Sequence, residues 1–274
     1  MRWKKLHRRR TPTMLELKDV SKVFYPGTIN EKLALDSVSL NVNDGDVICI
    51  VGSNGSGKST LFNTICGTYP VTGGSISFEG NDVTNMPEYR RAQSFGRIFQ
   101  DPTKGTAATM SVEDNLITAS RKGMRGLTFS LTAEKREFFR EQLIPIGLDS
   151  RLKDNVGLLS GGQRQALTLL MTVLSRPKML LLDEHTAALD PGNAQIVMNL
   201  TEHFIHQFNL TVLMITHNMQ HAIDFGNRLV MMDEGNIILD VDGEEKKKLT
   251  VPKLIELFKT IKNKTYATDE ALLV

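Results

Sequence analysis

The sequence has few cysteines, a single tryptophan and no long apolar run. Its two cysteines, Cys49 and Cys66, show no spacing typical of a disulfide framework or a metal site. We interpret both as small buried apolar side chains. No stretch reaches the roughly 18 continuous apolar residues of a membrane helix, and the basic N-terminal residues are not followed by the apolar segment of a secretory signal. These shortages predict a cytosolic protein that meets a membrane only through partners.

Basic side chains gather at the N-terminus. The formal net charge is +2, yet residues 1–13 carry six basic side chains and no acidic one, which leaves −4 for the remaining residues. A basic arm of this kind can bind anionic lipid or nucleic acid. We favour a flexible tail or an extended start, because the first patterned strand begins at Met14. The remaining chain has no basic stripe, so we predict that it does not bind nucleic acid.

A glycine-rich loop follows an apolar run at residues 46–51, which is typical of a buried parallel strand. The loop, residues 52–60, reads Gly-Ser-Asn-Gly-Ser-Gly-Lys-Ser-Thr and is called the phosphate loop below. Its glycines let backbone N–H groups surround an anion, and the helix predicted over residues 59–66 turns its positive end toward that anion. A chance turn is the alternative, but the flanking strand and helix argue against it. The residues predicted to bind the nucleotide here are Ser53, Asn54, Gly55, Ser56, Gly57, Lys58, Ser59 and Thr60.

Two side chains of this loop have specific predicted tasks. Lys58 reaches the β- and γ-phosphates of a nucleotide, and the Ser59 hydroxyl binds Mg²⁺. The loop by itself does not separate a transporter ATPase from a nucleotide kinase or a GTPase.

An acidic pair follows a second apolar run. Asp183 ends the run, where a carboxylate can hold Mg²⁺ or its water shell beside the phosphates. Glu184 comes next and can orient or deprotonate an attacking water. Solvated turn chemistry is the alternative for such a pair, and the phosphate loop upstream argues against it. The sequence therefore predicts ATP and Mg²⁺ as the ligands.

Five motifs downstream of the phosphate loop resemble the ABC ATPase family, in its order, within a match from about Leu15 to Asp240. They are Arg-Ile-Phe-Gln (residues 97–100), similar to the Q-loop; Leu-Ser-Gly-Gly-Gln-Arg-Gln (159–165), similar to the signature loop; Met-Leu-Leu-Leu-Asp-Glu (179–184), similar to the Walker B strand; Ala-Leu-Asp (188–190), similar to the D-loop; and Thr-His-Asn (216–218), similar to the switch histidine.

The resemblance implies an α/β fold, namely a P-loop NTPase with a RecA-like core, an antiparallel β subdomain and an inserted α-helical subdomain. It divides the chain into a basic N-terminal extension (1–13), an ABC ATPase domain (14–240) with its helical subdomain at about 101–165, and a C-terminal extension (241–274). In that extension we interpret the charged run 244–248 as a solvated face and the apolar stripe of 251–258 as a surface that docks on the core.

The same resemblance assigns roles to site residues. Glu184, His217 and Gln100 are implied to be catalytic, and Ser59, Gln100 and Asp183 to bind Mg²⁺. The adenine base is implied to stack on Phe24 or Tyr25; spacing favours Phe24, and simple packing is the alternative. Contacts to ATP held by a second subunit are implied for Ser160, Gly161, Gly162, Gln163 and Asp190.

His185 departs from the family pattern, which usually has proline after the catalytic glutamate. A catalytic role is conceivable because histidine titrates near neutrality. We favour a subfamily variant that changes the stiffness of the loop, because proline would fix φ. We interpret His7, His203, His206 and His221 as surface or packed residues.

The family implies the ATP-hydrolysing subunit of a membrane transporter, acting as a dimer with transmembrane permease subunits at the cytoplasmic face. Residues 183–191, 216–220 and 226–235 resemble a bacterial importer subfamily that uses an extracytoplasmic binding protein and includes tryptophan-type amino-acid importers. A lipid or peptide exporter and a soluble ATPase of nucleic acid or translation are the alternatives.

Overall fold

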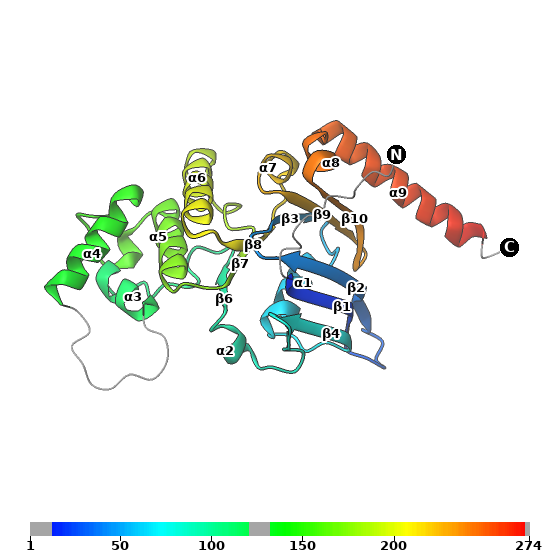
Figure 1. Cartoon of the computed structure of the whole chain (residues 1–274), viewed down its shortest axis with the longest axis horizontal. Coiled ribbons are helices and arrows are strands. Elements are labelled where there is room, and N and C mark those ends of the chain that lie inside the picture. The colour runs from blue at the N-terminus through cyan, green and yellow to red at the C-terminus, as the bar shows by residue number, and fades with distance from the viewer. Residues whose placement is uncertain (1–12, 121–131, 272–274) are drawn as a thin grey trace, which may run out of the picture.

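The computed structural model describes the backbone of residues 13–120 and 132–271, and the side chains as far as residue 261. The predicted loop at 121–127 and most of the N-terminal extension lie outside these residues. Two sheets and a group of helices make up the described part (Figure 1).

The smaller sheet is antiparallel, with the order β2-β1-β4-β5. The sequence predicts strands at residues 15–20 and 34–42. The observed strands are longer, because bulges between Leu17 and Val20 and between Val20 and Lys22 let β1 and β2 stay paired as far as Phe24. β1 also begins at Thr13, inside the predicted N-terminal extension, where it pairs with Asn43. The strands are β1 (Thr13–Phe24), β2 (Lys32–Asn43), β4 (Gly73–Phe78) and β5 (Asn81–Asp82).

The larger sheet has the order β10-β9-β3-β8-β7-β6, and the contacts from β9 to β6 are parallel. The strand that leads into the phosphate loop, β3, lies between β8 and β9. Only β10 runs antiparallel, as a hairpin with β9 that ends at Asp242, past the predicted domain boundary. The strands are β3 (Val47–Gly52), β6 (Phe95–Ile98), β7 (Met179–Asp183), β8 (Thr211–Ile215), β9 (Arg228–Asp233) and β10 (Asn236–Asp242).

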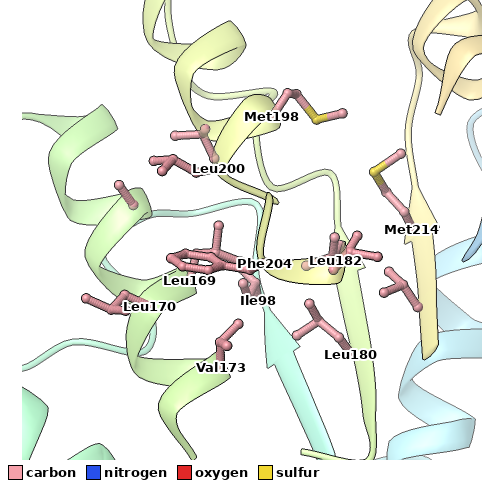
Figure 2. Packing of buried hydrophobic residues seen from close by; sticks show 14 of the residues in the cluster. Ile98, Leu169, Leu170, Val173, Leu180, Leu182, Met198, Leu200, Phe204 and Met214 are labelled. Atoms are coloured by element: carbon pink, nitrogen blue, oxygen red, sulfur yellow. The ribbon is translucent and has the colours of Figure 1, made fainter. Parts of the chain in front are cut away.

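Both faces of the larger sheet are buried at β3, β7 and β8, which explains why these strands are continuous apolar runs. Alternate residues point to opposite faces: Leu180 and Leu182 belong to one apolar cluster, whereas Leu181 belongs to the other. The first cluster packs β7 against α5 (Gly161–Leu174) and α6 (Pro191–Phe208), as Figure 2 shows. The second packs the sheet against β1, β2 and α1 (Lys58–Cys66).

Two of the helices between β6 and β7, α3 and α4, lie beyond α5, at the end of the molecule away from the antiparallel sheet (Figure 1). The Ser111 side chain caps α3 (Val112–Ala119), and the Thr132 side chain caps α4 (Ala133–Leu143). The sequence predicts one helix over residues 132–146. In the structure, α4 ends at Leu143 and a 3₁₀ turn, Ile144–Ile146, follows it; Gly147, with φ 66°, ends this turn. A second 3₁₀ turn, Val156–Leu158, precedes the signature loop. The short α2 (Glu88–Arg91) precedes β6.

The C-terminal segment corrects one sequence prediction. The charged run 244–248 was interpreted as a solvated face, but Lys246 of α8 (Gly243–Lys247) is buried. Its ammonium donates to the carbonyls of Phe225 at 2.5 Å and Gly226 at 2.9 Å, at the end of α7 (Met219–Asp224). These acceptors follow the helix C-terminus, where a cation is favoured.

The long C-terminal helix, α9 (Val251–Ala271), turns its apolar stripe to the core through Leu254, Leu257 and Phe258. None of the helices formed by the described residues is long and apolar enough to cross a membrane.

Candidate functional site

The backbone of the phosphate loop requires glycine at two places. Gly52 has φ 154°, and a Cβ there would lie 2.1 Å from the Met232 carbonyl oxygen. Gly57 has φ 101°, and a Cβ there would lie 2.6 Å from the Ala34 carbonyl oxygen. The loop therefore winds tightly between β3 and α1 with room only for backbone. Such a cradle suits an anion held by N–H groups at a helix N-terminus.

The Lys58 side chain is buried within the loop. Its ammonium donates to the carbonyl oxygens of Gly52 at 2.9 Å and Ser53 at 2.8 Å. Burial lowers the pKa of this ammonium, while the carboxylates of Glu184 and Asp183 act in the opposite direction. The carboxylates therefore compensate only part of the effect of burial on the pKa of Lys58.

The phosphate loop borders a cavity of about 510 Å³. The structure brings together here residues that were predicted separately: Phe24 and Tyr25 from the antiparallel sheet, and Glu184 and His217 from the loops after β7 and β8. The predicted phosphate-loop residues that line the cavity are Asn54, Gly55, Gly57, Lys58, Ser59 and Thr60. Ser53 and Ser56 turn elsewhere, since Ser53 donates to the Asp233 carboxylate at 2.9 Å and Ser56 is buried.

Phe24 and Tyr25 differ in how firmly they are held. The Phe24 ring meets Tyr69 edge-on with centroids 5.2 Å apart, and the Lys22 ammonium lies 5.1 Å from its centroid. Tyr25 is 68% exposed and has φ 52°. A fixed ring is the better stacking surface, so the geometry favours Phe24, as the spacing did.

Glu184 and His217 form a close pair beside the phosphate loop. His217 Nε2 lies 2.5 Å from Glu184 Oε1. The Glu184 backbone has φ 50° and its N–H donates to the Ile215 carbonyl at 3.1 Å. Two parallel strands thus end together, and each delivers one member of the pair.

Arg97 is a residue of the site to which the sequence assigned no role of its own, although it lies in the motif similar to the Q-loop. Its guanidinium donates to Asp183 at 3.1 Å and to the Asn63 amide oxygen of α1 at 2.7 Å, and it lies over the Phe99 ring at 4.6 Å. The signal available in the sequence was one cation inside the otherwise apolar strand β6. Arg97 ties the first predicted metal-binding carboxylate to the helix that follows the phosphate loop.

Gln100 lines a neighbouring cavity of about 490 Å³, together with Arg97 and Asp183. Ser59 lines the phosphate-loop cavity instead. The three predicted Mg²⁺ ligands therefore border two adjoining hollows, which Asp183 and Glu184 join as consecutive residues.

The signature loop lies apart from these hollows, since its residues line neither cavity. Ser160 caps α5 by a reciprocal pair of hydrogen bonds: Ser160 Oγ accepts from the Gln163 N–H at 3.2 Å, and Gln163 Oε1 accepts from the Ser160 N–H at 3.2 Å. Ser160 and Gly161 are exposed, whereas Gly162 is buried with its Cα facing the Asn193 side chain.

Asp190, the predicted D-loop residue, caps α6 in a similar way. Its carboxylate accepts from the Asn193 N–H at 3.1 Å and from the Asn193 side-chain amide at 2.6 Å. These bonds hold the pKa of the Asp190 carboxyl below its ordinary value. Within one chain, Gly162 of the signature loop faces Asn193 of α6, the same residue that bonds to Asp190, and none of the described hydrogen bonds joins Asp190 to the phosphate loop.

His185 is buried against α6 and does not line the phosphate-loop cavity. Its Nε2 lies 3.1 Å from the Thr201 hydroxyl. Burial lowers the pKa of the imidazole to about 4, so the ring is neutral near pH 7. The geometry agrees with the interpretation of His185 as a residue that affects the loop and not the reacting groups.

Comparisons with known proteins agree with this architecture. The family described as ABC transporter matches residues 35–187. A tyrosine transport ATP-binding protein of Clostridioides difficile is 43% identical over 252 residues, which cover 89% of this chain and 98% of that protein. A methionine import ATP-binding protein of Corynebacterium efficiens is 33% identical over 82% of this chain, which spans 62% of that longer protein.

Solved structures give the same result. An ATP-binding cassette of an ABC transporter in its ADP conformation has a TM-score of 0.73 at 31% identity, over 90% of this chain and 98% of that one. A dimeric cassette in a post-hydrolysis state, bound to ADP and phosphate, has a TM-score of 0.70 at 25% identity, over 84% of this chain and 98% of that one.

Proposed function

This chain belongs to the ABC transporter family, and from that premise we propose that it is the ATP-hydrolysing subunit that powers import of an amino acid through a separate permease. The observation that carries the hydrolytic part is the Glu184–His217 pair at the end of the phosphate-loop cavity. The similarity to the tyrosine transport ATP-binding protein, over nearly its whole length, supports the amino-acid class.

The phosphate loop binds the phosphates of ATP through backbone N–H groups and Lys58, and Phe24 stacks on the adenine with Tyr25 beside it. Ser59 and Asp183 offer a hydroxyl and a carboxylate, the oxygen donors that suit Mg²⁺, with Gln100 at the adjoining hollow. Mg²⁺, when bound, neutralises charge on the phosphates. Arg97 keeps Asp183 turned toward α1 by its ion pair.

Glu184 is proposed to orient a water beside the phosphates and to accept its proton. His217 donates from Nε2 to the Glu184 carboxylate, which holds that carboxylate in one orientation. His217 also lines the phosphate-loop cavity, so it links the position of Glu184 to the contents of that cavity.

A second copy of the chain is proposed to complete the site. The exposed Ser160 stands at the first turn of α5, where an anion is favoured, but it does not line the phosphate-loop cavity of its own chain. In a two-fold dimer, the signature loop and Asp190 of one copy meet ATP held by the other. The dimeric relatives in the post-hydrolysis state support this arrangement.

The helices α3 and α4 are proposed to contact permease subunits at the cytoplasmic face of the membrane. An extracytoplasmic binding protein would deliver the substrate to that permease, without touching this chain. In this arrangement, closure of the dimer on ATP moves the helical end of each chain and the permease with it.

Glu184→Gln tests the hydrolytic assignment. The variant keeps the shape of the side chain but loses the base, so ATP binding should persist while turnover falls by about 10²–10⁴-fold. Steady-state phosphate release and binding of a fluorescent ATP analogue measure the two effects. Glu244→Gln, an exposed change outside the site, is the matched control. Near-normal hydrolysis by Glu184→Gln would refute the assignment.

Transport assays test the amino-acid class. The chain, co-purified from its native membrane with its permease and placed in vesicles with the binding protein, should take up aromatic amino acids when ATP is supplied. Vesicles that carry Glu184→Gln are the control. Uptake of lipids or peptides in the opposite direction would place the chain with exporters.

A further inference from the structure

His185 is tied to a helix that carries none of the phosphate-binding residues. We propose that His185 is a positioning residue, which anchors the loop after β7 to α6 through Thr201 and thereby keeps Glu184 aimed at the phosphate-loop cavity. The inference rests on the proposed function, because it concerns the placement of the residue that is proposed to accept the proton.

The backbone of Glu184 is in a conformation that needs support. Its φ of 50° lies in the left-handed region, which side chains other than glycine rarely adopt. Such a conformation persists where the surrounding structure over-determines it, and it is found most often at functional sites. Residue 184 must therefore be held by contacts both from the strand before it and from the loop after it.

On the strand side, the support comes from the backbone. The Glu184 N–H donates to the Ile215 carbonyl at 3.1 Å, which continues the pairing of β7 with β8. On the loop side, the Glu184 carbonyl accepts from the Ala187 N–H at 2.9 Å, in a turn that runs from the buried His185 to the exposed Ala187. A turn of this kind does not fix its own direction, so another anchor is needed after Glu184.

The His185 side chain supplies that anchor. The Thr201 hydroxyl donates its only proton to the Val197 carbonyl at 2.7 Å, one turn back along α6. Its oxygen can then only accept from His185, which fixes the proton of the imidazole on Nε2. Thr201 is fully buried and His185 is 2% exposed, so this bond is shielded from bulk solvent. The imidazole also borders a cavity of about 420 Å³ that Glu184 and His217 line.

The anchor is rigid because α6 is rigid. Val197, Phe204 and Ile205 pack into the larger apolar cluster between α5 and the sheet. The chain of contacts His185–Thr201–Val197 thus joins the backbone beside Glu184 to the middle of α6. Loosening this link should misplace the Glu184 carboxylate without altering the groups that hold ATP.

Thr201→Val tests the inference, because valine keeps the shape of threonine and removes the acceptor. We expect kcat for ATP to fall by about 10–100-fold with KM nearly unchanged, since small misplacements of reacting groups have effects of this size. Thr201→Ser restores the hydroxyl and should recover most of kcat. Thr168→Val is the matched control, because Thr168 is also buried and bonds the carbonyl four residues back, but on α5.

Two double variants separate positioning from general destabilisation. His185→Ala with Thr201→Val should be no slower than either single change, because both break one link. Thr201→Val added to Glu184→Gln should not reduce the residual turnover further. Thermal unfolding and ATP binding confirm that each variant is folded.

The outcomes distinguish this inference from the proposed function. If Glu184→Gln is inactive while folded Thr201→Val keeps wild-type kcat, only the inference fails. Additive losses in the double variant, or a loss confined to KM, also overturn it. If Glu184→Gln keeps its activity, the proposed function itself is wrong.

Discussion

The phosphate loop and the signature loop both lead into a helix, but the two helices begin in different ways. No side chain caps α1, and the Lys58 side chain is folded into the loop. Ser160 and Gln163 cap α5 reciprocally and leave Ser160 exposed. The first turn of α1 therefore keeps its backbone donors for a ligand, whereas the cap of α5 occupies the N–H groups of Ser160 and Gln163. In the proposed site, the phosphate loop is a binding cradle within its own chain, and the signature loop is an exposed helix end proposed to bind the ATP of a partner copy.

Breaking the cradle should have the largest effect. Lys58→Ala removes the only ammonium inside the loop, so we expect ATP affinity to fall by about 100-fold or more, as losing charge-assisted hydrogen bonds to phosphates implies. Titration with a fluorescent ATP analogue measures the change. Lys247→Ala, on an exposed face of α8, is the control and should bind normally. Unchanged affinity in Lys58→Ala would remove the phosphate loop from the proposed site.

Breaking each half in a separate copy tests whether the halves belong to different chains. Lys58→Ala and Ser160→Arg should each be inactive alone. Their heterodimer keeps one site with an intact phosphate loop and an intact signature loop, while the other site carries both changes. An equal mixture should therefore regain up to about a quarter of wild-type activity if the two sites act independently. Phosphate release before and after subunit exchange measures the gain, and a mixture that stays inactive under full exchange would indicate coupled sites or a single-chain site.

Crosslinking checks the same geometry without relying on turnover. Cysteines at Ser53 and Gly161 should form a bond between chains when Glu184→Gln holds ATP. Gly161 suits this purpose because its added Cβ meets only Leu189 at 3.5 Å, whereas a Cβ at Gly162 would lie 2.6 Å from the Asn193 side chain. The native cysteines are buried and do not compete. A bond formed only within one chain would contradict the dimer.

A smaller effect is expected in the pH dependence of the free energy of unfolding. Cys49 on β3 and Cys66 on α1 flank the phosphate loop, and burial raises the pKa of these thiols to about 12 and about 11. Above pH 9 the unfolded thiols ionise while the folded ones stay protonated. The free energy of unfolding should therefore fall with rising pH, by about 1.4 kcal/mol per pH unit for each thiol.

Urea unfolding at about pH 8 and about pH 10 measures this slope. A variant with Cys49→Ala and Cys66→Ala shares every other titrating group, so it should show a shallower decline than the wild type. Equal slopes would mean that the thiols are not shielded around the phosphate loop.

The sequence predicted best what is buried on both faces of the larger sheet. The apolar run at residues 211–215 predicts a strand, and β8 has the same bounds. The agreement follows because a strand buried on both faces needs a continuous apolar run. The residues Ser-Val-Glu-Asp at 111–114 resemble a capping box and predict a helix start there, and the Ser111 side chain does cap α3, since capping depends on residues three apart. A structural feature can be predicted from the sequence when the residues that interact in it are close along the chain.

The rest depended on partners far away in the chain. Lys246 is buried because two carbonyls after α7 accept its protons. Arg97 is half-buried because Asn63 and Asp183 accept hydrogen bonds from its guanidinium. In the same way, Thr201 decides what His185 does. A charged or titrating side chain gives no indication of such partners in the sequence, so its burial was missed.

The position of β3 in the sheet also sets the order of events during synthesis. β3 is made early, but both of its neighbours, β8 and β9, come from the last third of the chain. At roughly 5–20 residues per second, the ribosome needs on the order of ten seconds or more to reach them. Through that interval, the strand Val47–Gly52 has no partner in the larger sheet, and its apolar side chains are open to chaperones and to other nascent chains. The phosphate loop is thus translated well before the two strands that flank β3 in the sheet.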